Sequence, residues 1–450
     1  MAKDFIVAIE LGSSKIVGAA GKRNADGSLN ILAFAQKESA SFIHKGYVYN
    51  IDKTSKAISE IVTSLSNQLQ TQIKQVYVGI GGQSIRSIKN NIVREFAVGT
   101  KISQNLVDNM MDSNRATRYP EQEIQDVSVQ EYKVDYQYQI DPIGIECTRI
   151  EASFLNLISR RAFFRNLKNC FTAAGVHNTD FYLSPLALAD VVLTAAERRA
   201  GCVLVDLGAD TTTVAVYYKN ILRHLAVIPL GSSNITKDIT SQQIDDHDAE
   251  IMKLKYACAY TENSEIDKDL KYPIDSQRSI DSSLFIDIVE SRLQEILENV
   301  KSQIPNELEG KLMAGYILTG GGSMMKNMEI AMNKFIHVGH VRIAKTITNS
   351  VLTKVENINI NNGTLNTLWG LIAKGRDNCA GVEFNPRELF HEQPPVPEPP
   401  VPEPPAPEPP TPGPLGSDGG GNGTAQQNGK KKNFFGSVVD FFKSILTEDE

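Results

Sequence analysis

The chain has 450 residues and a formal net charge of −7 at pH 7, with 41% hydrophobic and 22% charged residues. A chain of this length can bury two or more cores, and its composition is that of an ordinary soluble globular protein. The acidic balance argues against a general nucleic-acid binder, because proteins that follow phosphate backbones carry a basic surface, so we expect no nucleic-acid partner.

The cysteines and the apolar segments indicate a cytosolic protein without a membrane span. The five cysteines are scattered and form no C-x-x-C pair, which predicts reduced thiols. The N-terminus lacks the long apolar core of a signal peptide, and no stretch approaches the roughly 20 apolar residues that a spanning helix needs. Any membrane contact is therefore expected to be peripheral.

The first 82 residues predict a β-meander, a helix and a further strand. Residues 5–9 read as a strand that ends in an acid-Leu-Gly turn, and strands over 16–20 and 29–35 are joined by a polar hairpin turn. Apolar residues at helical spacing indicate a helix over 55–72, and 76–82 reads as a strand closing on a Gly turn. A dinucleotide-binding fold would place a helix directly after the first Gly loop, so this order excludes it.

The sequence pattern changes in the middle of the first half of the chain. Residues 83–160 predict a small inserted subdomain of short strands with one helix near 103–115. Helices are then expected over 159–175 and from Ser184 onward, where Pro185 stands just inside the helix start, as its fixed φ allows.

The stretch 202–213 repeats the pattern of the N-terminus. Four apolar residues, Asp206, a glycine and a run of hydroxyls predict a buried strand and a tight turn that can face a phosphate. Residues 5–15 carry the same order around Glu10, and a hairpin over 213–218 and 221–228 repeats the meander as well. This duplication predicts two similar half-domains facing one ligand.

The remaining globular part predicts helices, a third Gly turn and a last helix. Helices are expected over 248–259 and 283–304, separated by an irregular segment over 261–282. Residues 317–319 read as a strand ending in a Gly-rich turn, and a helix is expected over 364–374. From Gln393 to about Pro414 an acidic proline repeat predicts polyproline II on the order of 70 Å long, followed by a Gly-rich stretch to Gly429.

The last segment predicts an amphipathic helix. Its apolar residues share one broad face and three lysines stand at its start, which is typical of a helix lying in a membrane interface. The alternative is a helix that docks on the protein's own core. The residues expected to contact the membrane are Lys430, Lys431, Lys432, Phe434, Phe435, Val438, Phe441, Phe442, Ile445 and Leu446.

The Gly turns suggest a phosphate and magnesium site. Each acid-Leu-Gly turn offers backbone N–H groups and hydroxyls to phosphate oxygens, while Glu10 and Asp206 can hold a hydrated Mg²⁺. Lys15 can reach the phosphates as a point charge. Ordinary tight turns and a solvated lysine are the plain alternatives, and the repetition of the turn favours the ligand site.

The chain resembles a known family at these motifs. Two phosphate hairpins and a late T-G-G-G turn are similar to the actin, Hsp70 and hexokinase superfamily, and within it residues 4–380 resemble the bacterial cell-division FtsA family. The matching segments are Glu10–Lys15, Val205–Gly208, Leu222–His224, Ile228–Gly231, Asp248–Glu250 and Leu318–Gly322.

The resemblance implies an α/β fold of the actin-like two-domain type, built from duplicated ribonuclease-H-like halves. Residues 1–82 and 161–197 would form the first domain, with 83–160 as its inserted subdomain. Residues 198–380 would form the second domain, whose last helix returns to the first. A Pro/Gly-rich linker over 381–429 and an amphipathic membrane-targeting helix over 430–450 would follow.

The resemblance also implies ATP and Mg²⁺ as ligands. Glu250 and Lys253 match the family's E-x-x-K that grips ribose and adenine, although without the family a surface ion pair would be the preferred interpretation. Asp210 stands where many relatives have glycine and Glu10 replaces an Asp, and both argue against fast hydrolysis. The implied nucleotide contacts are Gly12, Ser13, Ser14, Lys15, Gly208, Ala209, Asp210, Thr211, Thr212, Gly231, Glu250, Lys253, Gly320, Gly321, Gly322 and Ser323.

The function implied is that of an anchor rather than an enzyme. The resemblance predicts an ATP-binding protein on the cytoplasmic face of the inner membrane at the division septum. There it would tether FtsZ through the FtsZ C-terminal peptide, recruit other division proteins and polymerise with itself. Arg292 is a candidate contact for the peptide, with a helix-surface ion pair as the alternative, and the inserted subdomain is a candidate filament and partner contact.

Two other functions compete. A small-molecule kinase of the same superfamily would need a carboxylate base, for which Asp190 is the candidate, against simple solvation of the helix. An Hsp70-like chaperone would need a β-rich peptide-binding domain, and only a proline linker and one helix follow the globular part. None of the seven histidines has the spacing of a zinc site, and Trp369 is expected in the core.

Overall fold

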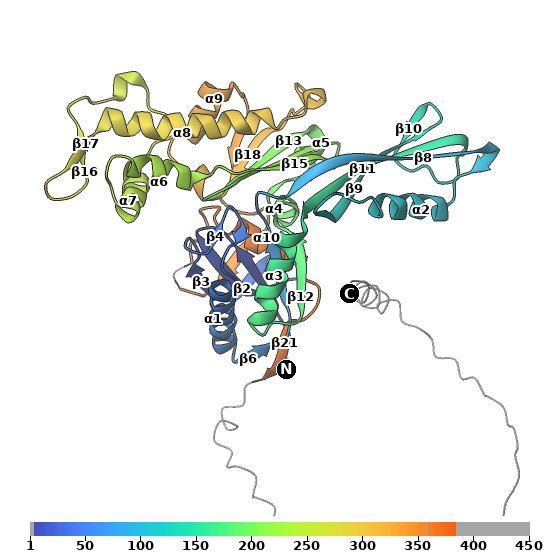
Figure 1. Ribbon diagram of the computed structural model, residues 1–450, viewed down its shortest axis with the longest axis horizontal. Coiled ribbons are helices and arrows are strands. Elements are labelled where there is room, and N and C mark those ends of the chain that lie inside the picture. The colour runs from blue at the N-terminus through green and yellow to red at the C-terminus, as the bar shows by residue number, and fades with distance from the viewer. Residues whose placement is uncertain (1–3, 357, 384–450) are drawn as a thin grey trace, which may run out of the picture. The chain divides into compact units, whose positions relative to one another are not determined.

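Two sheets carry the fold of the residues that the computed structural model describes, 4–356 and 358–383 (Figure 1). The first half of the molecule is built on a six-stranded sheet. In spatial order its strands are β12 (Thr179–Leu183), β7 (Val76–Ile80), β1 (Ile6–Leu11), β2 (Lys15–Arg23), β3 (Leu29–Glu38) and β20 (Val351–Thr353).

The second sheet has nine strands and is shared between the second half and the inserted subdomain. In spatial order these are β10 (Gln137–Gln139), β9 (Gln122–Val134), β11 (Glu146–Arg160), β8 (Arg86–Lys101), β15 (Ile221–Ile228), β14 (Thr212–Tyr218), β13 (Cys202–Leu207), β18 (Gly315–Thr319) and β19 (Val341–Ile343). Three strand pairs stand apart: β4 (Ile43–His44) with β5 (Tyr47–Val48), β6 (Thr71–Ile73) with β21 (Ala380–Glu383), and β16 (Lys271–Pro273) with β17 (Ser279–Asp281).

The predicted duplication is confirmed in strand order and in register. β1–β2–β3 and β13–β14–β15 are antiparallel meanders, and the first strand of each has a parallel neighbour on its other side, β7 and β18. Glu10 pairs with Val17 in the first meander, and Asp206 pairs with Thr213 in the second. The two acids therefore occupy equivalent positions at the ends of equivalent strands.

Helices cover both faces of the first sheet. α1 (Ile51–Leu69) and α3 (Arg161–Ala173) pack together on one face, while α4 (Ser184–Val192) and α10 (Asn366–Lys374) pack together on the other. α1 begins earlier than its apolar spacing predicted, because the side chain of Asn50 caps it by accepting from the N–H of Lys53. Trp369 of α10 is 1% exposed, which confirms its predicted place in the core.

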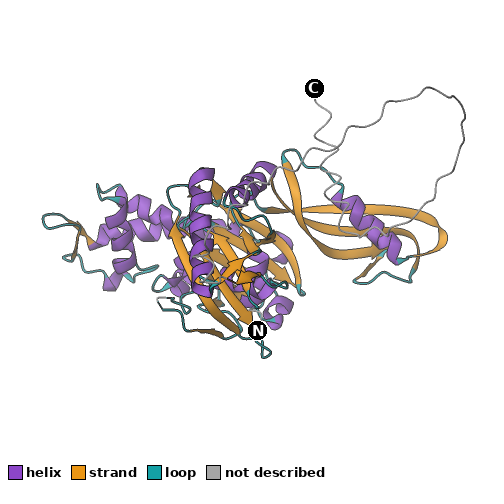
Figure 2. Ribbon diagram, turned by 90° about the horizontal axis from the view of Figure 1, so that it is seen from below, coloured by secondary structure: helices purple, strands orange, loops and turns teal. Residues whose placement is uncertain are grey.

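The inserted subdomain differs from its prediction. Its strands β8, β9 and β11 have 16, 13 and 15 residues, so the prediction of short strands is wrong. One helix, α2 (Gln104–Arg115), covers one face of these strands over a small core, and Figure 2 shows the long strands beside it. β8 pairs with β15 of the second half through Arg86 and Ala226, so the insertion continues the sheet of the half that follows it in sequence.

Three helices of the second half lie near their predicted places: α7 (Asp246–Tyr256), α8 (Ser282–Ser302) and α9 (Met328–Ile336), which follows the third Gly turn. Two further helices, α5 (Ala195–Ala200) and α6 (Ser232–Thr240), were not predicted. The short 3-10 turns are η1 (Asn263–Glu265), η2 (Asn306–Leu308) and η3 (Gly321–Met324). The prediction of an irregular segment over 261–282 is wrong in part, because η1 and the β16–β17 hairpin lie within it.

None of the helices in the described ranges has the length and apolar character that crossing a bilayer requires. All five cysteines are free, as predicted. The proline repeat, the Gly-rich stretch and the predicted amphipathic helix over 430–450 lie outside the described residues.

Candidate functional site

The three Gly turns meet at one cleft of about 1530 Å³. α7 lines it as well, so residues from both halves surround the same space. Most of the predicted site residues line this cleft: Glu10, Gly12, Ser13, Ser14, Lys15, Asp206, Gly208, Ala209, Asp210, Thr211, Glu250, Lys253, Gly320, Gly321 and Gly322. The sequence thus predicted one site from residues of which the first and the last are more than 300 positions apart.

Three predicted residues do not line the cleft. Thr212 and Ser323 are fully buried, and their hydroxyls donate to the carbonyls of Leu230 and Gly320 at 2.9 and 2.8 Å. Gly231 lies behind the second turn, at the start of α6. These residues shape the turns from within, and direct contact with a ligand was the wrong interpretation for the two hydroxyls.

The first two turns have the same hydrogen bond. The N–H of Gly12 donates to the carbonyl of Lys15 at 3.0 Å, and the N–H of Gly208 donates to that of Thr211 at 2.9 Å. A Cβ on either glycine would lie within 2.8 Å of the same carbonyl oxygen. The N–H groups of the two residues inside each turn take no part in the hydrogen bonds of the described chain, which leaves them for an anion.

Two further glycines let the turns approach each other. A Cβ on Gly231 would lie 2.3 Å from the carbonyl oxygen of Ala209. Gly320 has φ +84°, and a Cβ there would lie 2.3 Å from Oδ1 of Asp206. Any larger side chain at either position would displace the second turn or its acid.

Glu10 and Asp206 form an acidic pair at the floor of the cleft. Oε2 of Glu10 is buried and has no hydrogen-bond partner in the described chain. Burial, and then the charge of Asp206, raise the pKa of Glu10 to about 8, while burial raises the pKa of Asp206 to about 6. At neutral pH the pair therefore holds a proton, mainly on Glu10.

This pair fits a hydrated cation better than a direct metal cage. Within the described chain no cluster of three or more His, Cys, Asp or Glu side chains is arranged to hold a metal ion. Two carboxylates and an unpartnered oxygen suit Mg²⁺ that keeps several waters and completes its shell with phosphate oxygens. Glu10 and Asp206 would hold such an ion from the protein side.

Lys253 is more than a surface ion pair. It is 7% exposed, and its Nζ donates to Oε2 of Glu250 at 2.7 Å, to Oγ1 of Thr236 at 2.9 Å and to the carbonyl of Ser232 at 3.2 Å. Oγ1 of Thr236 in turn donates to Oε2 of Glu250 at 2.6 Å. These bonds fix α7 to α6, so the half-exposed carboxylate of Glu250 is held in place at the cleft.

The other two candidates lie elsewhere. Asp190 does not line the cleft, and its carboxylate pairs with Arg198 at 2.9 Å and with Lys374, so it is neither a base at the site nor simply solvated. Arg292 of α8 donates from Nη2 to Oδ1 of Asp238 at 3.0 Å and also contacts Glu295. It bridges α8 to α6, as the ion-pair alternative expected.

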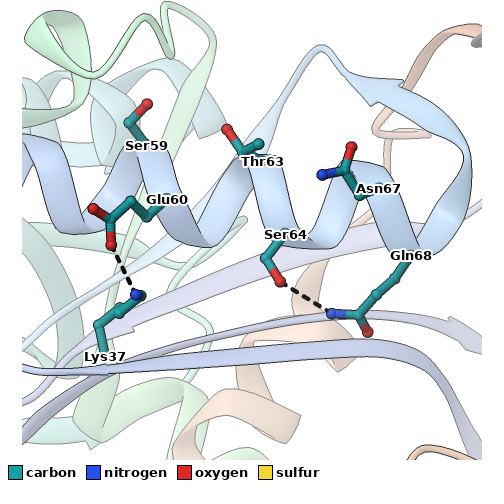
Figure 3. A pocket seen from close by; sticks show the side chains of 7 residues that line it. All are labelled: Lys37, Ser59, Glu60, Thr63, Ser64, Asn67 and Gln68. Carbon is teal, nitrogen blue, oxygen red and sulfur yellow. Dashed lines mark hydrogen bonds and ion pairs between the residues drawn. The ribbon is translucent and has the colours of Figure 1, made fainter.

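Sequence reasoning missed part of the cleft wall. Gly46, Gly81 and Gly82 line it, as do Thr364 and Thr367 near the start of α10. Lys45 and Gly46 form the turn between β4 and β5. It was missed because both strands have only two residues and Lys-Gly is not one of the usual hairpin dipeptides. A second pocket, over α1 and β3, contains none of the predicted site residues (Figure 3).

Known proteins match the chain over most of its length. The family profile described as "Cell division protein FtsA" matches residues 203–361, and the one described as "SHS2 domain inserted in FTSA" matches residues 82–158. The chain is 32% identical over 347 residues to the cell division protein FtsA of Porphyromonas gingivalis, covering 75% of this chain and 71% of that protein. The chain belongs to the FtsA family.

Other FtsA relatives agree. The chain is 31% identical over 332 residues to the cell division protein FtsA of Neisseria meningitidis, covering 71% of this chain and 79% of that one, and 26% identical over 367 residues to that of Escherichia coli K12, covering 78% and 86%. Among solved structures, a chain of the PilM–PilN type IV pilus biogenesis complex aligns with a TM-score of 0.57 at 14% identity, covering 82% of this chain and 97% of that chain.

These matches confirm the family and the fold predicted from the motifs. The chain is a cell-division protein of the FtsA family, with an actin-like α/β fold and an insertion that matches the FtsA SHS2 domain.

Proposed function

We propose that this FtsA family member binds ATP with Mg²⁺ in the cleft, as a structural ligand. The observation that carries the proposal is the pair of equivalent Gly turns, which present unbonded N–H groups beside the unpartnered Glu10 Oε2. Bound Mg²⁺ would neutralise phosphate charge. The turns would bind the phosphates, and Glu250 with the Gly321–Met324 turn would contact the nucleoside.

The nucleotide is proposed to govern assembly rather than to be consumed quickly. Glu10 retains a proton at neutral pH, and Asp190 lies outside the cleft in an ion pair with Arg198. The one base that the kinase hypothesis named, Asp190, is therefore not placed beside a bound substrate, which disfavours the small-molecule kinase. Binding across two halves would favour a closed state and self-association into filaments.

The nucleotide site is tested by calorimetric titration with MgATP. Asp206→Ala and Gly321→Arg are each expected to abolish binding. Gly321→Ala is the matched control, because a Cβ at this position meets only Cγ2 of Thr364 at 3.6 Å and its φ is not positive. Retained affinity in Gly321→Arg, or equal losses in both Gly321 variants, would contradict the placement of the third turn.

We further propose that the C-terminal segment tethers the protein to the cytoplasmic face of the inner membrane, at the division septum. Support comes from the sequence pattern over 430–446, where aromatic residues share a face and lysines precede them. Co-sedimentation with anionic vesicles tests it, using the whole chain and a version ending at Gln393. Only the whole chain should pellet with the vesicles, and equal pelleting would refute the tether.

The proposed partners are FtsZ, other division proteins and further copies of this chain. The FtsZ C-terminal peptide is assigned to the surface around Arg292, and the inserted subdomain to filament and partner contacts. Since Arg292 already pairs with Asp238, Arg292→Ala also removes a contact between α8 and α6. Asp238→Asn is therefore the control: peptide affinity should fall in Arg292→Ala and persist in Asp238→Asn, as measured by fluorescence anisotropy.

A further inference from the structure

The Lys45–Gly46 turn contacts both Gly turns of the cleft. It joins β4 to β5, and its residues have φ of 51° and 76°, as primed two-residue hairpin turns require. The N–H of Lys45 donates to Oδ2 of Asp210 at 3.1 Å, and the N–H of Gly46 donates to Oγ of Ser13 at 3.1 Å. One short turn of the first half therefore reaches across to the second half.

The same turn packs on the start of the inserted subdomain. The carbonyl of Lys45 accepts from the N–H of Gln83 at 3.1 Å. A Cβ on Gly46 would lie 2.4 Å from Cα of Gly82, so the two backbones touch. Gln83 stands just before β8, the first strand of the subdomain. A displacement of the turn is therefore passed to β8 by main-chain contacts, without a flexible side chain between them.

Asp210 brings a negative charge to the second Gly turn. Its carboxylate strengthens the hydrogen bond from the N–H of Lys45, because charged acceptors form stronger bonds. An anion bound in the turn disfavours rotamers that bring the carboxylate closer to it, and the N–H of Lys45 offers the carboxylate a donor outside the turn. An anionic ligand and the Asp210–Lys45 bond therefore stabilise each other, as coupled equilibria must.

We propose that Asp210 is a latch across the cleft, which couples binding of a polyphosphate to ordering of the start of the inserted subdomain. The inference rests on the proposed nucleotide function for the identity of the ligand. Asp210 is a positioning residue in this account: it acts through the Lys45–Gly46 turn and Gln83 and takes no part in chemistry.

The latch is tested first without ligand, by hydrogen exchange of the full chain. In Asp210→Ala the amide of Lys45 should exchange about tenfold faster than in the wild type, since its acceptor is lost. Asp210→Asn keeps an acceptor oxygen and should lie between the two, which also covers a failure of the alanine variant to fold. Asp246→Ala removes another carboxylate that lines the cleft and should leave Lys45 unchanged. Equal exchange in wild type and Asp210→Ala overturns the latch.

The coupling is tested with MgATP and, separately, with inorganic pyrophosphate. In the wild type, ligand should slow exchange over 43–48 and 83–88. In Asp210→Ala, ligand is added to saturation, because loss of the coupled bond weakens its binding. It should then leave exchange over 83–88 unslowed, and equal slowing there overturns the latch. An absence of slowing in the wild type with both ligands overturns it as well. Slowing by pyrophosphate in a wild type that does not bind ATP would contradict the nucleotide function and support the latch.

Discussion

At the scale of single residues, Glu10 of the Glu10–Asp206 pair makes the stability of the protein depend on pH. In the unfolded chain Glu10 ionises near its ordinary value of 4.5, whereas in the folded chain its pKa is raised to about 8. The folded state therefore binds more protons between these values, and stability falls as the pH rises through this window. A bound cation would oppose this loss by favouring the ionised carboxylate.

We expect Glu10→Gln to remove this pH dependence. Without nucleotide or divalent cation, the wild type should lose stability relative to Glu10→Gln as the pH rises from about 5 to about 8, because only the wild type must give up a proton from this site. Urea unfolding at several pH values measures the difference. Parallel profiles for the two proteins would show that Glu10 is not the titrating group.

At the scale of secondary-structure elements, part of the free edge of strand β3 is covered by a side chain of α1. β20 pairs with β3 only from Leu29 to Ile31. Beyond that, the side chain of Gln68 on α1 accepts from the N–H of Phe34 at 3.1 Å and donates to its carbonyl at 2.9 Å. Figure 3 shows Gln68 next to Asn67 on the same helix. Gln68 therefore occupies hydrogen-bonding groups that could otherwise pair with another strand.

Gln68→Ala should destabilise the protein by about 1 kcal/mol and make it more prone to associate, because two backbone groups of an edge strand lose their partner. Asn67→Ala is the matched control, since no hydrogen bond of its amide group is found in the described chain. Chemical denaturation and light scattering measure the two effects. Identical behaviour of both variants would remove the role assigned to Gln68.

A buried amide network holds the inserted subdomain together. Asn114 of α2 and Asn156 of β11 are fully buried and exchange two hydrogen bonds, of 2.6 and 3.0 Å. Asn90 of β8 donates to Asn114 at 2.8 Å. Asn90 lies within the single long strand β8, and its side chain binds α2.

Asn156→Ala should lower the free energy of unfolding by about 2 kcal/mol, because it leaves Nδ2 of Asn114 without its acceptor in the core, although Oδ1 of Asn114 keeps the bond from Asn90. The loss should appear as faster hydrogen exchange in α2, with a smaller change in the first half. The double variant Asn156→Ala with Asn114→Ala should lose less free energy of unfolding than the two single variants lose in sum. Additive costs would mean that the two amides do not act as a unit.

On the scale of the whole molecule, the burial of each cysteine differs between the cores and the cleft. Burial raises the pKa of the thiols of Cys170 and Cys379 to about 11 and of Cys202 to about 12, and Cys147 is buried as well. Cys258 is partly exposed and lines the cleft. Thiol reactivity in the native protein should therefore be concentrated in the cleft.

A thiol reagent should modify one of five cysteines quickly in the native chain, and Cys258→Ser should remove that fast phase. If nucleotide occupies the cleft, MgATP should slow the reaction. A colorimetric thiol assay follows both, with the unfolded protein giving the total. Several fast thiols in the native protein would contradict the burial of the other four cysteines.

The sequence predicted most of the site because its motifs are local, and less of the long-range pairing. Glu10 with Gly12, and Asp206 with Gly208, can be read within short segments, and their repetition implied a shared cleft. The pairing of β8 with β15 rests on a single residue pair, Arg86 with Ala226, and nothing in either segment specifies it. The Lys45–Gly46 turn was missed because its role depends on contacts with Asp210 and Gln83, which lie far along the chain.

The matched registers of Glu10 and Asp206 also bear on the direction in which a ligand can lie. If the two equivalent strands and their turns lined the cleft identically, an elongated ligand could lie in it either way round. The turns themselves differ in charge, since Lys15 stands at the end of the first and Asp210 lies within the second. The strands that carry the two turns are equivalent, but the charges on the two turns are opposite. An asymmetric anion therefore has one preferred orientation in the cleft.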